Sequence, residues 1–397
     1  MMIKGNSQRL DPSFVTLVLM VNPRLFERDD VLTAKLLRNH ELDWPSVMRF
    51  AGRHRVMPLL ANRARELNWF RGTSLEIDAD VITSLQSEID RAVFSEMAAL
   101  AELKRLYCAF DGIGIAPILL KGLALSQICF DAMGRRTNRD IDLFIDEVEL
   151  DPCDAILCSL GYVRIEPKVD TSISDFAMWK KNHKDCVYFH PKNRSVLEMH
   201  YRLFDNHHLC HPVLLSEKDE VNLFSQLNVP SLRPDYLIAY LAMHGLLHGW
   251  SRLKWLIDFA ILTSQLEVSF TGRTVNHIEL YRPFDRAVGT GNQVCEYFFG
   301  EAFPTHHAAI ATDRKRHSFL ARITINSICG AGTTELEDTR FGTTLKNLSH
   351  YLLWSNPAYL LSEMKFDLTD MSREEQSSGT NMPDWLRRPS AWTRRHF

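Results

Sequence analysis

The spacing of hydrophobic residues changes along the 397-residue chain, and each change predicts a different kind of structure. Up to residue 111, apolar residues recur at helical spacing. From 112 to about 220, short apolar runs alternate with helical segments, which is typical of a sheet flanked by helices. Helical spacing then returns, before a polar and basic end. We therefore predict an α+β protein with four parts: an N-terminal helical region (1–111), a core (112–220), a C-terminal helical domain (221–370) and a flexible basic tail (371–397).

The core is expected to contain strands that end or begin in polar residues. An apolar run ends in Lys121-Gly122, and the segment that follows it, 123–130, has the character of a helix. A basic loop then leads to a second strand that starts at Asp140. The predicted strands are 115–120, 140–145, 160–165, 185–190 and 195–200, the last two forming a hairpin. A helix is predicted over 151–159 and a loop over 166–174.

Two acidic residues at the start of the second strand form the first candidate site. Asp140 and Asp142 are two positions apart, so on a strand their side chains point the same way, about 7 Å apart. Two carboxylates this close repel each other unless a cation lies between them. Oxygen ligands of this kind suit Mg²⁺. The alternative is that Arg135, Arg136 and Arg139 in the preceding loop neutralise the acids without any metal.

These residues resemble the signature of the DNA-polymerase-β-like nucleotidyltransferase superfamily, in which a glycine turn after a strand precedes a strand with Asp-x-Asp. The closer resemblance is to a branch of bacterial "uncharacterised nucleotidyltransferase" domains, through Leu120-Lys-Gly122, Arg136 and Asp140-Ile-Asp-Leu143. Two further blocks resemble that branch, one around His54 and one from His244 to Asp258. The chain departs from the superfamily pattern where Lys121-Gly122-Leu123 replaces the usual Gly-Ser.

The resemblance implies roles for further residues. A third acid on a later strand would be Glu198, with His200 beside it, so that Asp140, Asp142 and Glu198 would be the catalytic metal ligands. Lys121, Gly122, Arg136 and Arg139 would bind the triphosphate. Lys254 would contact a phosphate, or else form a structural ion pair with Asp258. For His54 we favour a packing or capping role, and the pair His244 and His248 lacks a third zinc ligand nearby.

Composition narrows the choice of partners. A formal net charge of −3 gives no global basic excess, so a nucleic-acid acceptor is less expected than a small molecule, a peptide or a protein. The eight cysteines include no Cys-x-x-Cys pair, which argues against zinc and thioredoxin-type sites, and scattered single cysteines suit a reducing cytosol. The apolar run at 14–21 is too short to span a bilayer. The sequence therefore predicts a cytoplasmic protein without a membrane anchor.

The expected activity is transfer of a nucleoside monophosphate from an NTP, most simply ATP, to a hydroxyl, with release of pyrophosphate and with Mg²⁺ or Mn²⁺ as cofactor. Two alternatives stay open: a catalytically silent protein that binds nucleotide or a partner, and a kinase-like phosphotransferase. If repulsion between carboxylates dominates, Asp142→Asn should leave the stability of the metal-free protein unchanged or slightly raised.

Overall fold

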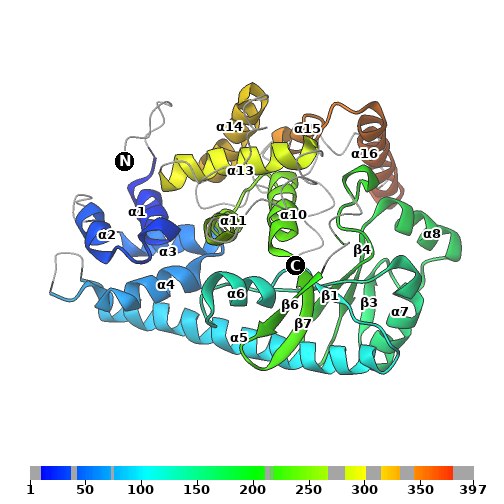
Figure 1. Cartoon of the computed structure of the whole chain (residues 1–397), viewed down its shortest axis with the longest axis horizontal. Helices are drawn as coiled ribbons and strands as arrows, with labels where there is room; N and C mark the ends of the chain where they lie inside the picture. The colour runs from blue at the N-terminus through cyan, green and yellow to red at the C-terminus, as the bar shows by residue number, and fades with distance from the viewer. Residues whose placement is uncertain are drawn as a thin grey trace. The chain divides into compact units, whose positions relative to one another are not determined.

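The structure is a computed structural model that describes residues 10–36, 43–72, 76–210, 215, 218–266, 282–300, 314–330 and 344–378. Its residues divide into two compact units, Ile89–Tyr240 and the combination of Met1–Glu88 with Leu241–Phe397. Figure 1 labels most of the helices and strands of both units. Among the described residues, no helix is long and apolar enough to cross a bilayer.

The unit formed by the two ends of the chain is helical. Its elements confirm the helical regions that the sequence predicts towards the two ends of the chain. The elements, including two helices that continue into the other unit, are α1 (Pro12–Met20), η1 (Pro23–Leu25), α2 (Asp29–Leu36), α3 (Trp44–Arg53), α4 (Met57–Glu66), η2 (Asn68–Phe70), α5 (Ala79–Asp111), α10 (Pro234–Leu247), α11 (Leu253–Leu266), α13 (Arg282–Phe299), α14 (Arg314–Gly330), α15 (Thr344–His350) and α16 (Pro357–Ser378). The expected tail from 371 begins inside α16, and residues 379–397 lie outside the described part.

The other unit contains a mixed sheet, as predicted for an α+β core. Seven described strands lie in the order β3-β4-β5-β2-β1-β7-β6. Pairs β2–β5 and β1–β7 are parallel, and the remaining neighbours are antiparallel. The elements are β1 (Ile118–Leu119), α6 (Leu123–Phe130), β2 (Ile141–Phe144), η3 (Glu147–Glu149), α7 (Leu150–Ser159), β3 (Val163–Glu166), α8 (Ile173–Asn182), β4 (Asp185–Phe189), β5 (Val196–His200), η4 (His207–Leu209), β6 (Lys218–Leu223) and β7 (Leu227–Leu232).

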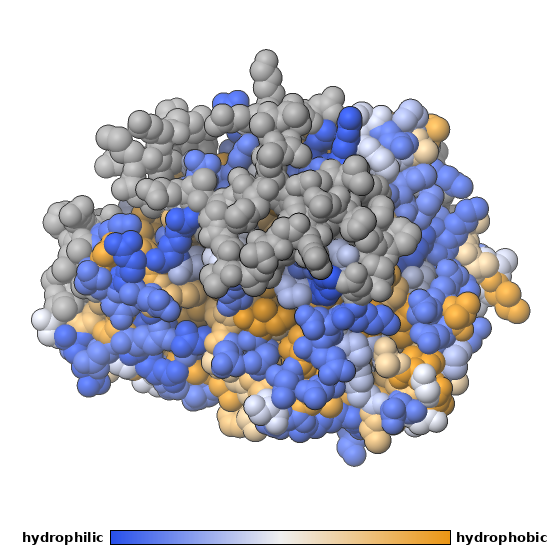
Figure 2. Space-filling model, viewed as in Figure 1, coloured by the Kyte–Doolittle hydropathy of each residue, from blue (hydrophilic) through white to orange (hydrophobic). Residues whose placement is uncertain are grey.

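Three of these elements differ from the prediction. β6 and β7 extend the sheet past residue 220 into a segment expected to be helical, and α8 begins in the predicted loop 166–174. β6 is mostly polar and β7 contains Pro230. Both features weaken the alternation of apolar and polar residues by which a strand is recognised in a sequence. α8 has no fully buried residue, so it lacks a strong apolar stripe. Exposed apolar residues gather there and on β3, and Figure 2 shows hydrophobic surface in this region, at the right of the view.

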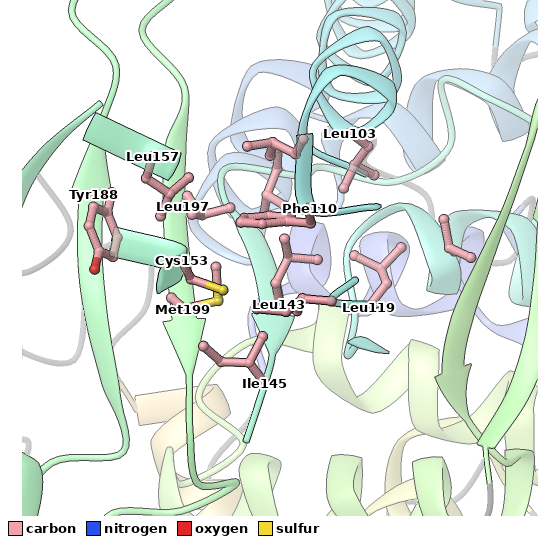
Figure 3. Packing of buried hydrophobic residues seen from close by; sticks show 14 of the residues in the cluster. Leu103, Phe110, Leu119, Leu143, Ile145, Cys153, Leu157, Tyr188, Leu197 and Met199 are labelled. Carbon is pink, nitrogen blue, oxygen red and sulfur yellow. The ribbon is translucent and has the colours of Figure 1, made fainter. Parts of the chain in front are cut away.

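One face of the sheet forms the hydrophobic core. Leu143 on β2 and the pair Leu197 and Met199 on β5 point to this face and pack with residues of α5 and α7 (Figure 3). On α5 the core residues are spaced three and four apart, as one face of a helix requires: Leu100, Leu103, Leu106 and Phe110. Because strand side chains alternate, the residues between these apolar positions point to the opposite face. That face carries the charged residues.

Candidate active site

Strand register brings the second and third predicted acids together. Asp142 on β2 and Glu198 on β5 are directly paired positions of two parallel strands. Two residues further along, Phe144 pairs with His200. Asp142 is completely buried, and Glu198 is 8% exposed. One oxygen of Asp142, Oδ2, is buried without a hydrogen-bond partner. A buried carboxylate oxygen in this condition is costly unless something else satisfies it.

A lysine from the turn after β1 lies against these acids. The Nζ atom of Lys121 is 2.9 Å from Asp142 Oδ1. The turn is held in place because the Leu120 N–H donates to the Asp142 carbonyl at 3.1 Å. Gly122 follows with a φ of 69° and a ψ of −120°, a backbone conformation that favours glycine. The predicted Lys-Gly turn therefore delivers its cation directly to the Asp-x-Asp strand.

His200 bridges the two acids. Its Nε2 atom is 3.3 Å from Asp142 Oδ1 and 3.3 Å from Glu198 Oε2. Its other nitrogen, Nδ1, faces the carboxylate of Asp185 at 3.9 Å. Burial and the Lys184 charge oppose protonation, but hydrogen bonds to the two acids raise the His200 pKa above its usual value. The imidazole thus links three carboxylates from three neighbouring strands.

Three site residues are absent from the sequence prediction. Asp185 is the position on β4 that pairs with His200, and the Nζ atom of Lys184 lies 2.5 Å from its Oδ2 atom. Tyr240 on α10 lies within electrostatic range of Lys121, Asp142, Lys184 and Glu198, and burial raises the pKa of its hydroxyl to about 12. Asp185 could have been identified from the hairpin register opposite His200, whereas Tyr240 belongs to a uniformly apolar helix that gives no such signal.

The charges of the cluster stabilise one another. Burial opposes ionisation of Glu198, but the His200 hydrogen bond and the charges of Lys184 and Lys121 hold its pKa well below its usual value. Burial likewise opposes the charge on Lys121, but Asp142, Asp140 and Glu198 help to raise its pKa well above the usual value. At neutral pH the site therefore combines an ionised Glu198 with a positively charged Lys121.

The donor atoms suit a divalent metal ion. One ligating atom each from Asp142, Glu198 and His200 lies within 4.8 Å of the other two, and within the described ranges no other group of three such residues meets this condition. Together with the unpartnered Asp142 Oδ2 atom, this arrangement fits a metal that would be held by these side chains. Asp140 lies outside this trio, half-buried just before β2, although its charge acts on Lys121.

The two predicted arginines lie in different surroundings. Arg136 is buried and donates to the Gly122 carbonyl at 3.1 Å and to the Asn138 side chain. Buried Glu96 completes this network by accepting from Ser126 at 2.5 Å, from the Gly134 N–H at 2.6 Å and from Asn138 at 2.8 Å. Arg136 thus braces the glycine turn from inside. Arg139 is exposed.

The remaining candidates lie in the helical unit. The Lys254 N–H, at the start of α11, donates to the His54 carbonyl at 3.3 Å, and the Leu253 N–H donates to His54 Nδ1 at the same distance. Burial lowers the His54 pKa well below its usual value, so this ring is neutral. His54 therefore satisfies the first N–H groups of α11, in line with the capping role that the sequence favoured. His244 and His248 contact each other and Trp255 through their rings.

Comparison with known proteins agrees with this geometry. The family described as "Uncharacterised nucleotidyltransferase" matches residues 40–300, which include the His54 block, the whole acid cluster and the block from His244 to Asp258. No curated protein matches the chain. Because the match covers well over half of the 397 residues, the chain belongs to this family of nucleotidyltransferases.

Proposed function

We propose that the protein transfers a nucleoside monophosphate from an NTP to a hydroxyl group of a small molecule, peptide or protein and releases pyrophosphate. The observation that carries the proposal is the pairing of Asp142 and Glu198 on adjacent parallel strands, with a buried carboxylate oxygen that lacks a partner. Family membership supports nucleotidyl transfer in general. The acceptor class rests on the balanced charge of the chain.

In this proposal Asp142 and Glu198 hold the metal, with Asp140 as the third acid. Bound Mg²⁺ or Mn²⁺ would activate the attacking hydroxyl and stabilise the leaving pyrophosphate. The protein's own contribution is largely the placement of charge. Lys121 is anchored to Asp142 and supplies positive charge beside the acids. Exposed Arg139 is the more accessible cation for a triphosphate such as ATP, while buried Arg136 keeps the Gly122 turn in shape.

The proposed role of Lys254 as a phosphate contact rests on the sequence resemblance. Its side chain is half-buried at the start of α11. Its near neighbours in the chain, Arg252 and Trp255, contact each other, with the guanidinium carbon of Arg252 5.8 Å from the centroid of the Trp255 ring. A cation at the N-terminus of a helix adds to the partial positive charge there, which favours anions. Lys254→Ala should raise the KM for NTP if this role is correct, and an unchanged KM would remove Lys254 from the site.

The product released from an NTP tests the proposal. The protein is incubated with each of the four NTPs and with Mg²⁺ or Mn²⁺, while pyrophosphate and nucleoside diphosphate are measured separately. We expect pyrophosphate from wild type, and none from Asp142→Asn or Glu198→Gln. Asp219→Asn, an exposed acid on β6, is the matched control and should behave as wild type. Release of nucleoside diphosphate would favour a kinase-like reaction, and nucleotide binding without any product would mean either a missing acceptor or a silent binding protein.

A further inference from the structure

The orientation of the His200 ring suggests a role beyond that of a neighbour to the acids. Its Nε2 atom lies 3.3 Å from one oxygen of each of Asp142 and Glu198. Adjacent donor atoms around a metal lie about 3.0 Å apart in octahedral sites and about 3.4 Å apart in tetrahedral sites, given metal–ligand distances of about 2.0–2.2 Å. The hydrogen-bonded imidazole nitrogen therefore already has the spacing from the two carboxylates that a third ligand would have.

The far side of the ring has a second feature of metal-bound histidines. A histidine that binds a metal through one nitrogen usually presents the other to a carboxylate, a carbonyl or water, which fixes the ring orientation. Here the carboxylate nearest to Nδ1 is that of Asp185, whose Oδ2 atom is 3.9 Å away, beyond hydrogen-bond distance, and is in turn held by Lys184. Asp185 is 2% exposed and His200 is completely buried, so this orientation is set by packing within the sheet.

We propose that His200 is a metal ligand through Nε2, with Asp185 behind it, and that this mixed nitrogen–oxygen site prefers a first-row transition metal to Mg²⁺. Imidazole suits transition metals, whereas Mg²⁺ prefers an all-oxygen shell. The inference concerns the same site as the proposed nucleotidyl transfer and rests on that function for its biological meaning. Its chemistry is tested separately, because metal binding is measured without nucleotide turnover.

The experiment uses Mn²⁺ as a paramagnetic probe of the full-length protein. After removal of bound metal by a chelator, Mn²⁺ is added below stoichiometric amounts, and nitrogen coupling to the ion is measured by pulsed electron paramagnetic resonance. We expect a ¹⁴N signal in wild type that is replaced by ¹⁵N coupling when only the histidines are labelled with ¹⁵N. This measurement needs no variant, so a folding defect cannot obscure it. Mn²⁺ bound without histidine nitrogen coupling would overturn the proposal.

Variants then assign the nitrogen and test the metal preference. His200→Gln should lose the coupling, whereas His190→Gln is a matched control, because His190 is a buried histidine of the same unit that contacts the Leu160 carbonyl instead. Asp185→Asn should retain the coupling but weaken Mn²⁺ binding by about 10–100-fold. Coupling that survives in His200→Gln would overturn the assignment, and so would Mg²⁺ that displaces Mn²⁺ at equal concentration.

The two proposals fail in different ways. A nitrogen-coupled metal in a protein that releases nucleoside diphosphate instead of pyrophosphate from NTPs would leave His200 as a ligand and contradict nucleotidyl transfer. Pyrophosphate release that depends on Asp142 and Glu198, with a metal that shows no nitrogen coupling, would do the reverse.

Discussion

Asp142→Asn should destabilise the metal-free protein, because Asp142 is a partner of Lys121 as well as a metal ligand. The two side chains are 2.9 Å apart, with Asp142 fully buried and Lys121 16% exposed. Removing one member of a buried ion pair costs about 3–5 kcal/mol. Lys121 retains the charges of Asp140 and Glu198, and asparagine keeps one oxygen as acceptor. We therefore expect a loss of about 2–3 kcal/mol, below the range for a completely abandoned charge.

Hydrogen exchange measures this loss locally. The amides of β2 and β5 should exchange about 30–150-fold faster in Asp142→Asn than in wild type, since 1.4 kcal/mol corresponds to a factor of about ten. Adding Lys121→Met should make the double variant less destabilised than the sum of the single variants, by about 1–2 kcal/mol. Unchanged or slower exchange in Asp142→Asn would refute the reasoning and restore the expectation from carboxylate repulsion alone.

Three further predictions concern the glycine turn and its brace. Arg136→Ala should lower the free energy of unfolding by about 2–4 kcal/mol. Replacing exposed Arg139 with alanine should change the free energy of unfolding by less than about 0.5 kcal/mol but should raise the KM for NTP. Equal effects of the two variants on urea unfolding would contradict this contrast. Burial raises the Glu96 pKa above 4.5 in the folded protein, so the unfolded chain loses this proton at a lower pH than the folded protein does. Wild type should therefore lose stability relative to Glu96→Gln as the pH rises from 4.5 through the folded pKa. A pH-independent difference between their urea unfolding curves would contradict the assignment. Gly122→Ala should lower the free energy of unfolding by about 1–3 kcal/mol through backbone strain alone. An added Cβ would approach only the Asp140 carbonyl, at 3.6 Å, so no steric clash contributes. An unchanged melting temperature would show that the turn tolerates alanine.

The sequence predicted the centre of the fold because its signals there are local. Alternating apolar residues on β2, β4 and β5 identified strands close to their observed bounds. The Lys-Gly turn and the Asp-x-Asp strand lie close together in the chain, so their proximity in space followed from the connection between them.

What the sequence did not predict depends on long-range packing. β6 and β7 pair with each other along their full length, although β6 is mostly polar and β7 contains proline. The burial of Arg136 depends on Glu96, forty residues earlier on α5, so its contact with the Gly122 carbonyl could not be read from the loop itself. The sequence placed Lys121 near the acids, but the 2.9 Å contact with the fully buried Asp142 side chain is visible only in the folded protein.

The Asp142–Glu198 cluster should bind a metal–nucleotide complex, and this binding can be measured without knowing the acceptor. The measurement is the affinity for an NTP analogue with a methylene bridge between its α- and β-phosphates, with and without Mn²⁺, in wild type, Asp142→Asn and the control Asp219→Asn. We expect tight binding of the analogue to wild type and to Asp219→Asn only when metal is present. Asp142→Asn should not bind it tightly even with metal. Binding of equal strength without metal, or in Asp142→Asn, would contradict this expectation.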